Sequence, residues 1–74
     1  MIRFKLKELI AEKSFQEGRR VTIEEISKST GIHRTTLSKL SNIKGYNAST
    51  DVLDKLCAFF DVKISDVAVF IKDE

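Results

Sequence analysis

Positions 22–42 restrict the fold more than any other part of the chain, because they hold start and stop signals for two short helices. Thr22 followed three residues later by Glu25 is typical of a capping box, which opens a helix. Gly31 is a plausible end for that helix, since glycine readily adopts the left-handed conformation found after helix C-termini. The signals predict a helix of less than three turns that begins at Thr22 and ends before Gly31.

A second helix is predicted over about residues 33–41, after a short link at Ile32 and His33. Leu37 and Leu40 mark its buried side by their helical spacing. The opposite side is polar and basic and carries Arg34, Thr35, Ser38, Lys39 and Asn42.

Two short helices joined by a tight turn with glycine form a helix-turn-helix, which presents its second helix to DNA. The major groove of B-DNA is about 12 Å wide and admits one α-helix, whose side chains then reach the base edges. We therefore predict a helix-turn-helix at residues 22–42, with the recognition helix at about 33–41 in the major groove.

The remaining segments predict an all-α fold, a small bundle of about five helices. Apolar spacing favours helices from about Lys5 to Gln16 and from Ser49 or Thr50 to Phe60. Residues 2–6 alternate apolar and charged side chains, and residues 64–71 are rich in β-branched side chains, so a short strand at either terminus is an alternative for these two segments.

Length and composition exclude several classes of protein. A chain of 74 residues is one domain, 1–74, and buries only about 60% of its unfolded surface, which is too little for a deep catalytic pocket. With one histidine, no glycine-rich phosphate loop and no clustered ligands, we expect neither an enzyme nor a bound metal or cofactor. The single cysteine, Cys57, is expected to be a small core residue.

No apolar run approaches the roughly 18 to 20 residues that cross a bilayer, and the first residues do not resemble a signal peptide. We therefore expect no membrane partner and a cytoplasmic location. Charge is segregated along the chain: residues 1–50 hold ten basic and five acidic side chains, and residues 51–74 hold three and six. The basic part would attract a polyanion.

The segment TIEEISKSTGIHRTTLSKLSN at 22–42 resembles the Cro and phage-repressor class of helix-turn-helix proteins, the XRE family. Residues 6–10 and 50–60 resemble the first and fourth helices of that family, so the likeness covers nearly the whole chain. The resemblance implies a lambda-repressor-like DNA-binding domain. It also implies sequence-specific binding of double-stranded DNA by a transcriptional regulator that acts as a repressor.

The resemblance places base contacts at Arg34 and Thr35, with Ser38 and Lys39 one turn further on. An arginine such as Arg34 can bond guanine O6 and N7 in bidentate fashion, and Lys39 can contact either a base or a phosphate. The expected backbone contacts, which set register rather than sequence, are Thr22, His33, Thr36, Asn42, Lys44, Tyr46, Asn47, Arg19 and Arg20.

Several of these residues have a second interpretation. His33 either reaches the DNA or is a solvated helix cap, and Tyr46 either stacks on DNA or covers the core. Arg19 and Arg20 lie in a link that is longer than usual in the family, and they are either a phosphate clamp or a surface pair without an acidic neighbour. The resemblance also expects glutamine at Ile23, whose contact would be absent here.

One recognition helix covers only a few base pairs, so a homodimer on a palindromic site is expected, with half-sites about 34 Å apart. The acidic C-terminal part, with Phe59, Phe70 and Ile71, is the expected dimer surface. The alternative is a protein-interaction module or an antitoxin-like accessory protein on the same scaffold. The salt dependence of DNA binding separates the two hypotheses.

Overall fold

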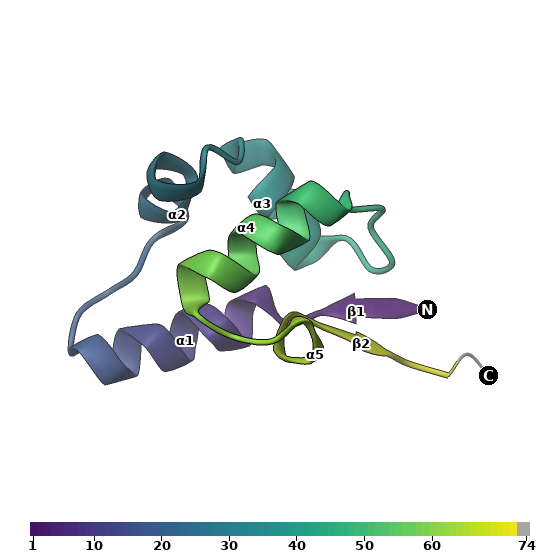
Figure 1. Ribbon diagram of the computed structural model, residues 1–74, viewed down its shortest axis with the longest axis horizontal. Helices are drawn as coiled ribbons and strands as arrows, with labels where there is room; N and C mark the ends of the chain where they lie inside the picture. The colour runs from purple at the N-terminus through teal and green to yellow at the C-terminus, as the bar shows by residue number, and fades with distance from the viewer. Residues whose placement is uncertain (73–74) are drawn as a thin grey trace.

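A computed structural model describes residues 1–72 and contains five helices and a two-stranded antiparallel sheet. The predicted small helical bundle is therefore confirmed. The longest helix has 12 residues, and no helix among residues 1–72 is long and apolar enough to cross a membrane. The elements follow one another as β1 (Ile2–Phe4), α1 (Leu6–Glu17), α2 (Ile23–Thr30), α3 (Arg34–Asn42), α4 (Thr50–Phe60), α5 (Ile64–Val67) and β2 (Ala68–Phe70) (Figure 1).

The helices end where the sequence predicts them to end. Gly18 and Gly31 follow α1 and α2 with φ of 64° and 78°, which is the left-handed conformation that glycine adopts without a Cβ clash. Asp61 follows α4 with φ of 54°, a conformation in which aspartate is one of the better tolerated side chains. Ser49 caps α4, since its Oγ accepts a hydrogen bond of 3.2 Å from the Val52 N–H.

The hydrophobic core is built from every helix. Each helix contributes one side chain with 0% exposure, so the loss of any one helix would open the same core. Full burial of one such side chain contributes about 1.5–3 kcal/mol. The five residues are Leu6 of α1, Ile26 of α2, Leu37 of α3, Leu56 of α4 and Val67 of α5.

The segment 64–71, for which helix and strand were both open, contains both. A single turn, α5, ends at Val67, and the chain continues into β2, which pairs with β1 in the register Ile2–Phe70 to Phe4–Ala68. The resulting ribbon of β1 and β2 extends away from the helices (Figure 1). Pairing with a strand at the other end of the chain is a tertiary contact, which local periodicity cannot reveal.

Candidate nucleic-acid interface

The turn between α2 and α3 consists of three residues, Gly31 to His33, as a helix-turn-helix requires. Ile32 at its centre is 4% exposed and anchors the turn in the core. Two side chains of α2 fix the backbone of Ile32: Ser27 Oγ donates to its carbonyl at 2.6 Å, and Thr30 Oγ1 accepts from its N–H at 3.1 Å. The backbone of the turn is therefore tied to α2 through both its N–H and its carbonyl group.

His33 is the N-cap of α3. Its Nδ1 accepts a hydrogen bond of 3.1 Å from the Thr35 N–H, which satisfies one of the donors that a helix N-terminus leaves free. The solvated-cap interpretation therefore describes its place in the fold. A contact with DNA through the rest of the exposed ring stays a prediction.

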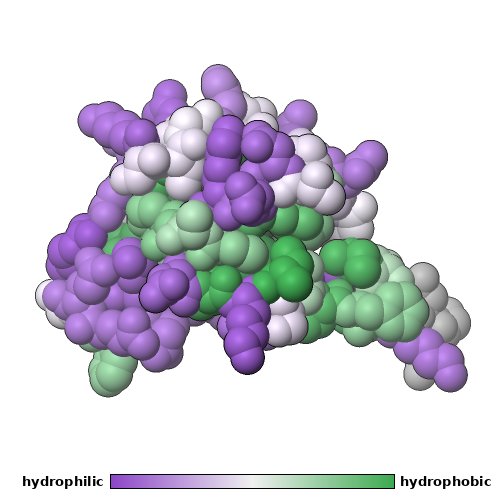
Figure 2. Space-filling model, viewed as in Figure 1, coloured by the Kyte–Doolittle hydropathy of each residue, from purple (hydrophilic) through white to green (hydrophobic). Residues whose placement is uncertain are grey.

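The face of α3 that points away from the core is polar. Leu37 and Leu40 are 0% and 2% exposed, and Thr36 is half-buried. Hydrophilic side chains project from the part of the surface that α2 and α3 form, at the top of Figure 2. The exposed residues of α3 are those predicted to face outward: Arg34, Thr35, Ser38, Lys39 and Asn42.

Arg34 is paired with a residue that the sequence analysis did not include in the site. Its Nη1 lies 3.1 Å from Oε1 of Glu24 in the first turn of α2, and both side chains remain about two-thirds exposed, at 65% and 68%. A glutamate in the first turn of a helix also interacts favourably with the helix dipole, so Glu24 has a local role in α2 as well. No periodicity joins residues ten positions apart, so only the angle between α2 and α3 reveals the pair.

The structure gives Arg19 two acidic neighbours, so the interpretation of Arg19 and Arg20 as a surface pair without one is wrong for Arg19. Its guanidinium forms a fork with the carboxylate of Glu25 at 2.7 and 2.6 Å and also bonds Glu17 at 2.9 Å. The hydrogen bond with Arg19 holds the pKa of Glu25 below its ordinary value, and the pKa of Arg19 is raised in turn. Arg20 is exposed and has no ion pair within residues 1–72, so the description as a surface arginine without an acidic neighbour holds for Arg20 only. Phosphate contact by either arginine stays a prediction.

The same fork alters the predicted capping box at the start of α2. Thr22 does cap the helix, because its Oγ1 accepts from the Glu25 N–H at 3.2 Å. The Glu25 carboxylate is directed to Arg19 instead of the Thr22 N–H. A bidentate bond to a guanidinium is stronger than a bond to a neutral amide, and it ties the link 18–22 to α2.

The other predicted backbone contacts lie at or after the end of α3. Asn42 is exposed, and its Nδ2 donates to the Ser38 carbonyl at 2.9 Å. Lys44 and Asn47 are exposed in the following loop. Tyr46 is half-buried and packs against the core, which favours the packing interpretation of that side chain.

Within residues 1–72, no three side chains of His, Cys, Asp or Glu gather in a way that could hold a metal ion. Cys57 is a free, half-buried cysteine that packs against the core, as expected from its position in α4.

Comparisons with known proteins agree with this architecture. Residues 5–73 match the Cro/C1-type HTH DNA-binding domain, which covers the helix-turn-helix and all five helices. The chain is also 34% identical over 62 residues to an uncharacterized HTH-type transcriptional regulator of Archaeoglobus fulgidus, a match that covers 84% of this chain and 86% of the relative. No solved structure matches the chain. The chain belongs to the family of Cro/C1-type helix-turn-helix DNA-binding domains.

Proposed function

We propose that the protein binds specific sequences of double-stranded DNA by inserting α3 into the major groove, and that it acts as a transcriptional repressor. The observation that carries this proposal is the division of α3 into two faces. Leu37 and Leu40 are buried, while every residue expected to reach DNA from this helix, Thr36 excepted, is exposed. A protein that covers its operator excludes other proteins from the same DNA, which is the physical basis of repression.

Base reading is assigned to Arg34, Thr35, Ser38 and Lys39. A guanidinium or ammonium group on this face can bond guanine O6 and N7, and hydroxyl groups can bond several bases. Lys39 has no ion pair within residues 1–72, whereas Arg34 is held by Glu24. Arg34 must therefore leave or share Glu24 when it reaches a base.

Contacts to the DNA backbone are assigned to the two ends of the motif. Thr22 and Arg20 lie at the start of α2, and Asn42 and Lys44 lie at the end of α3. Lys44 carries no ion pair among the described residues, so phosphate contact does not require an existing bond to break. These contacts fix the register of α3 in the groove without reading sequence.

We further propose that the protein binds as a homodimer through the face formed by α4, α5 and the ribbon. Leu53 and Ile64 line two adjacent surface grooves of this face, and Ile2 and Ala68 extend it onto the strands. An apolar band crosses the middle of the molecule and continues along the ribbon (Figure 2). A two-stranded ribbon is only marginally stable alone, so a covering partner would stabilise it.

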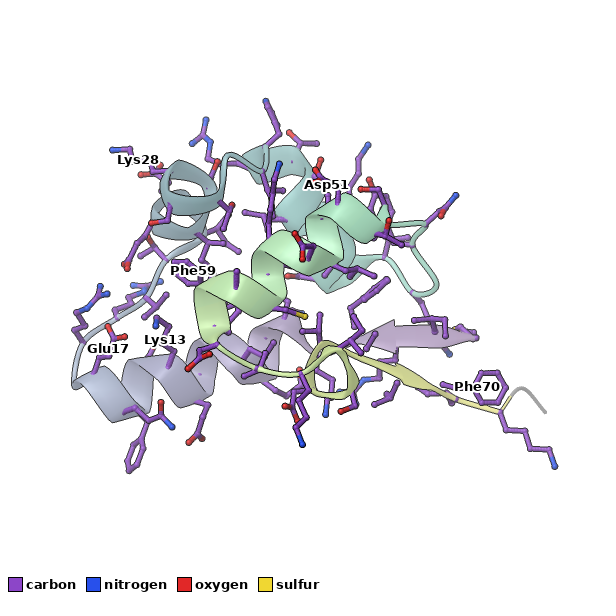
Figure 3. The ribbon with its side chains drawn as sticks, in the orientation of Figure 1. Lys13, Glu17, Lys28, Asp51, Phe59 and Phe70 are labelled. Atoms are coloured by element: carbon purple, nitrogen blue, oxygen red, sulfur yellow. The ribbon has the colours of Figure 1, made fainter. Side chains whose placement is uncertain are left out.

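A second copy is the partner that fits this face. Phe70 is 73% exposed near the outer end of β2 (Figure 3), and its partner in the strand register, Ile2, lines one of the grooves that a symmetry-related phenylalanine would enter. The charges also match, because Asp54, which has no ion pair within residues 1–72, lines one groove and Lys72 lies two residues after the exposed phenylalanine. In a twofold interface each copy supplies both the projecting side chain and the groove.

The competing hypothesis, a protein-interaction module or antitoxin-like accessory protein, is supported by the same apolar face. A salt series separates the two functions. Sites selected from random duplex DNA should yield a palindrome with half-sites about 34 Å apart. When the logarithm of the association constant for this DNA is plotted against the logarithm of salt concentration, the slope should be about −0.9 for each neutralised phosphate. The absence of any bound duplex in dilute buffer would contradict the DNA-binding proposal and favour the module.

A further inference from the structure

A surface pocket of about 250 Å³ lies between the ribbon, the start of α1 and the end of α3, beside the predicted backbone contacts. Three cations line it: Arg3 of β1, Lys7 of α1 and Lys44 of the loop after α3. Glu8 is the one carboxylate in the lining, and it forms an ion pair with Arg3. The charge of the lining is therefore positive, and Lys7 and Lys44 have no ion-pair partner within residues 1–72.

Ser41 gives this pocket a second, independent feature. Its Oγ is buried and has no hydrogen-bond partner. Among the side-chain nitrogen and oxygen atoms buried in residues 1–72, it is the one atom without such a partner. A buried hydroxyl without a hydrogen-bond partner is unfavourable, so Ser41 is a candidate to bond a polar ligand. Ser41 is also one of the residues that line the pocket.

The start of α1, which lies beside the pocket, lacks a capping side chain. The N-cap residue Lys5 makes no side-chain hydrogen bond to this helix end, unlike Thr22, His33 and Ser49 at the starts of the next three helices. The first N–H groups of α1 therefore have no acceptor within the helix and no capping side chain. Lys7 and Glu8, in this first turn, line the pocket.

We propose that this pocket binds a phosphate group, held by the ammonium groups of Lys7 and Lys44, the guanidinium of Arg3 and the hydroxyl of Ser41. The group is either a phosphate of the DNA backbone, just beyond the end of the recognition helix, or a free phosphate-bearing anion. The first source rests on the proposed DNA-binding function. A DNA phosphate bound in this pocket would extend the DNA-contacting surface from the helix-turn-helix to β1 and α1.

Lys7→Gln tests the site, and Lys63→Gln is the matched control, because Lys63 is an exposed lysine at the start of α5 outside the pocket. To test binding of a free anion, each protein is titrated with inorganic phosphate at constant ionic strength, and the backbone amide resonances are followed by NMR. Saturable shifts at Ser41 and Lys44 are expected in the native protein and in Lys63→Gln. Lys7→Gln should weaken this binding by about tenfold, the usual effect of losing one charged hydrogen bond.

The DNA arm measures the salt dependence of duplex binding for the same three proteins. Lys7→Gln should weaken binding to all sequences alike and reduce the log-log slope by about 0.9, the value for one phosphate, while Lys63→Gln leaves the slope unchanged. A change in this arm assigns the site to the DNA backbone. Saturation by phosphate without a change of slope assigns it to a free anion.

Ser41→Ala separates ligand binding from folding. Since alanine removes a hydroxyl that has no partner, the melting temperature of the free protein should stay unchanged or rise, while affinity for the anion falls. The proposal is overturned if phosphate produces no saturable shift and Lys7→Gln binds DNA with the slope of Lys63→Gln. If the native protein binds no duplex, the proposed DNA-binding function fails, and the phosphate titration still decides whether the pocket is an anion site.

Discussion

Arg34, the first residue of α3, forms an ion pair of 3.1 Å with Glu24 on the preceding helix. The pair places a carboxylate at the edge of the surface that is proposed to meet a polyanion. Because both side chains are about two-thirds exposed, the pair contributes less than about 1 kcal/mol to stability. Its consequence is therefore expected in DNA binding rather than in folding.

Glu24→Gln should strengthen binding to DNA, by about three- to tenfold at low salt. The change releases Arg34 and removes a negative charge that phosphates repel, and such effects are screened at high salt. The measurement is fluorescence anisotropy with labelled duplex at several salt concentrations. Glu12→Gln on α1 is the control, because it removes one negative charge outside the helix-turn-helix. Weaker binding by Glu24→Gln would mean instead that the carboxylate positions Arg34 for its base.

Arg34→Ala and Lys44→Ala should separate base reading from backbone contact. Loss of a bidentate contact to guanine removes about 1–3 kcal/mol of discrimination at one base pair, whereas loss of a phosphate contact weakens every sequence alike. Affinities for the selected operator and for a set of single-base variants measure both effects. Equal losses on all duplexes for both proteins would contradict the division of roles.

His33→Ala should destabilise the protein by about 1 kcal/mol, because the Thr35 N–H loses the Nδ1 acceptor that caps α3. His33→Ser restores a capping oxygen and should recover that stability. Urea unfolding followed by circular dichroism measures the difference. If serine fails to rescue stability, the hydrogen bond of the cap is not the source of the loss.

Acidification should destabilise the protein partly through the fork of Arg19 on Glu25. The pKa of Glu25 is below its ordinary value of 4.5 in the folded protein. The fork therefore stabilises the native state above that value, and the contribution is lost as the pH falls through the lowered value. The melting temperature of Arg19→Gln should accordingly fall less than that of the native protein on acidification below 4.5. If the melting temperatures of the two proteins fall in parallel as the pH is lowered, the fork contributes nothing to the pH dependence of stability.

Phe70→Ser should shift the proposed homodimer towards monomer without unfolding it, since the side chain is 73% exposed in the single chain. Phe15→Ser is the matched control, because Phe15 is 84% exposed on α1, outside the proposed face. Sedimentation equilibrium measures the association of both variants. If the two proteins associate as the native chain does, the ribbon is not the dimer surface.

The helices and the turn of the motif could be predicted from the sequence because their signals are local. A capping threonine, a glycine that adopts positive φ and leucines at helical spacing act within one or two helical turns. The exposed face of α3 follows from the same spacing, since burial of Leu37 and Leu40 leaves Arg34 and Lys39 on the other side. The prediction of an outward-facing recognition helix therefore needed no tertiary information.

Other features depend on contacts between residues far apart in the chain, so only the tertiary structure decided them. The pairing of β1 with β2 settled the segment 64–71, and the angle between α2 and α3 brought Glu24 to Arg34. The fork of Arg19 on Glu25 gives that arginine an acidic partner that the sequence did not reveal. The pocket around Ser41 likewise joins three separate elements. Local sequence fixes backbone preference and amphipathic faces, but which charges meet depends on how those faces pack.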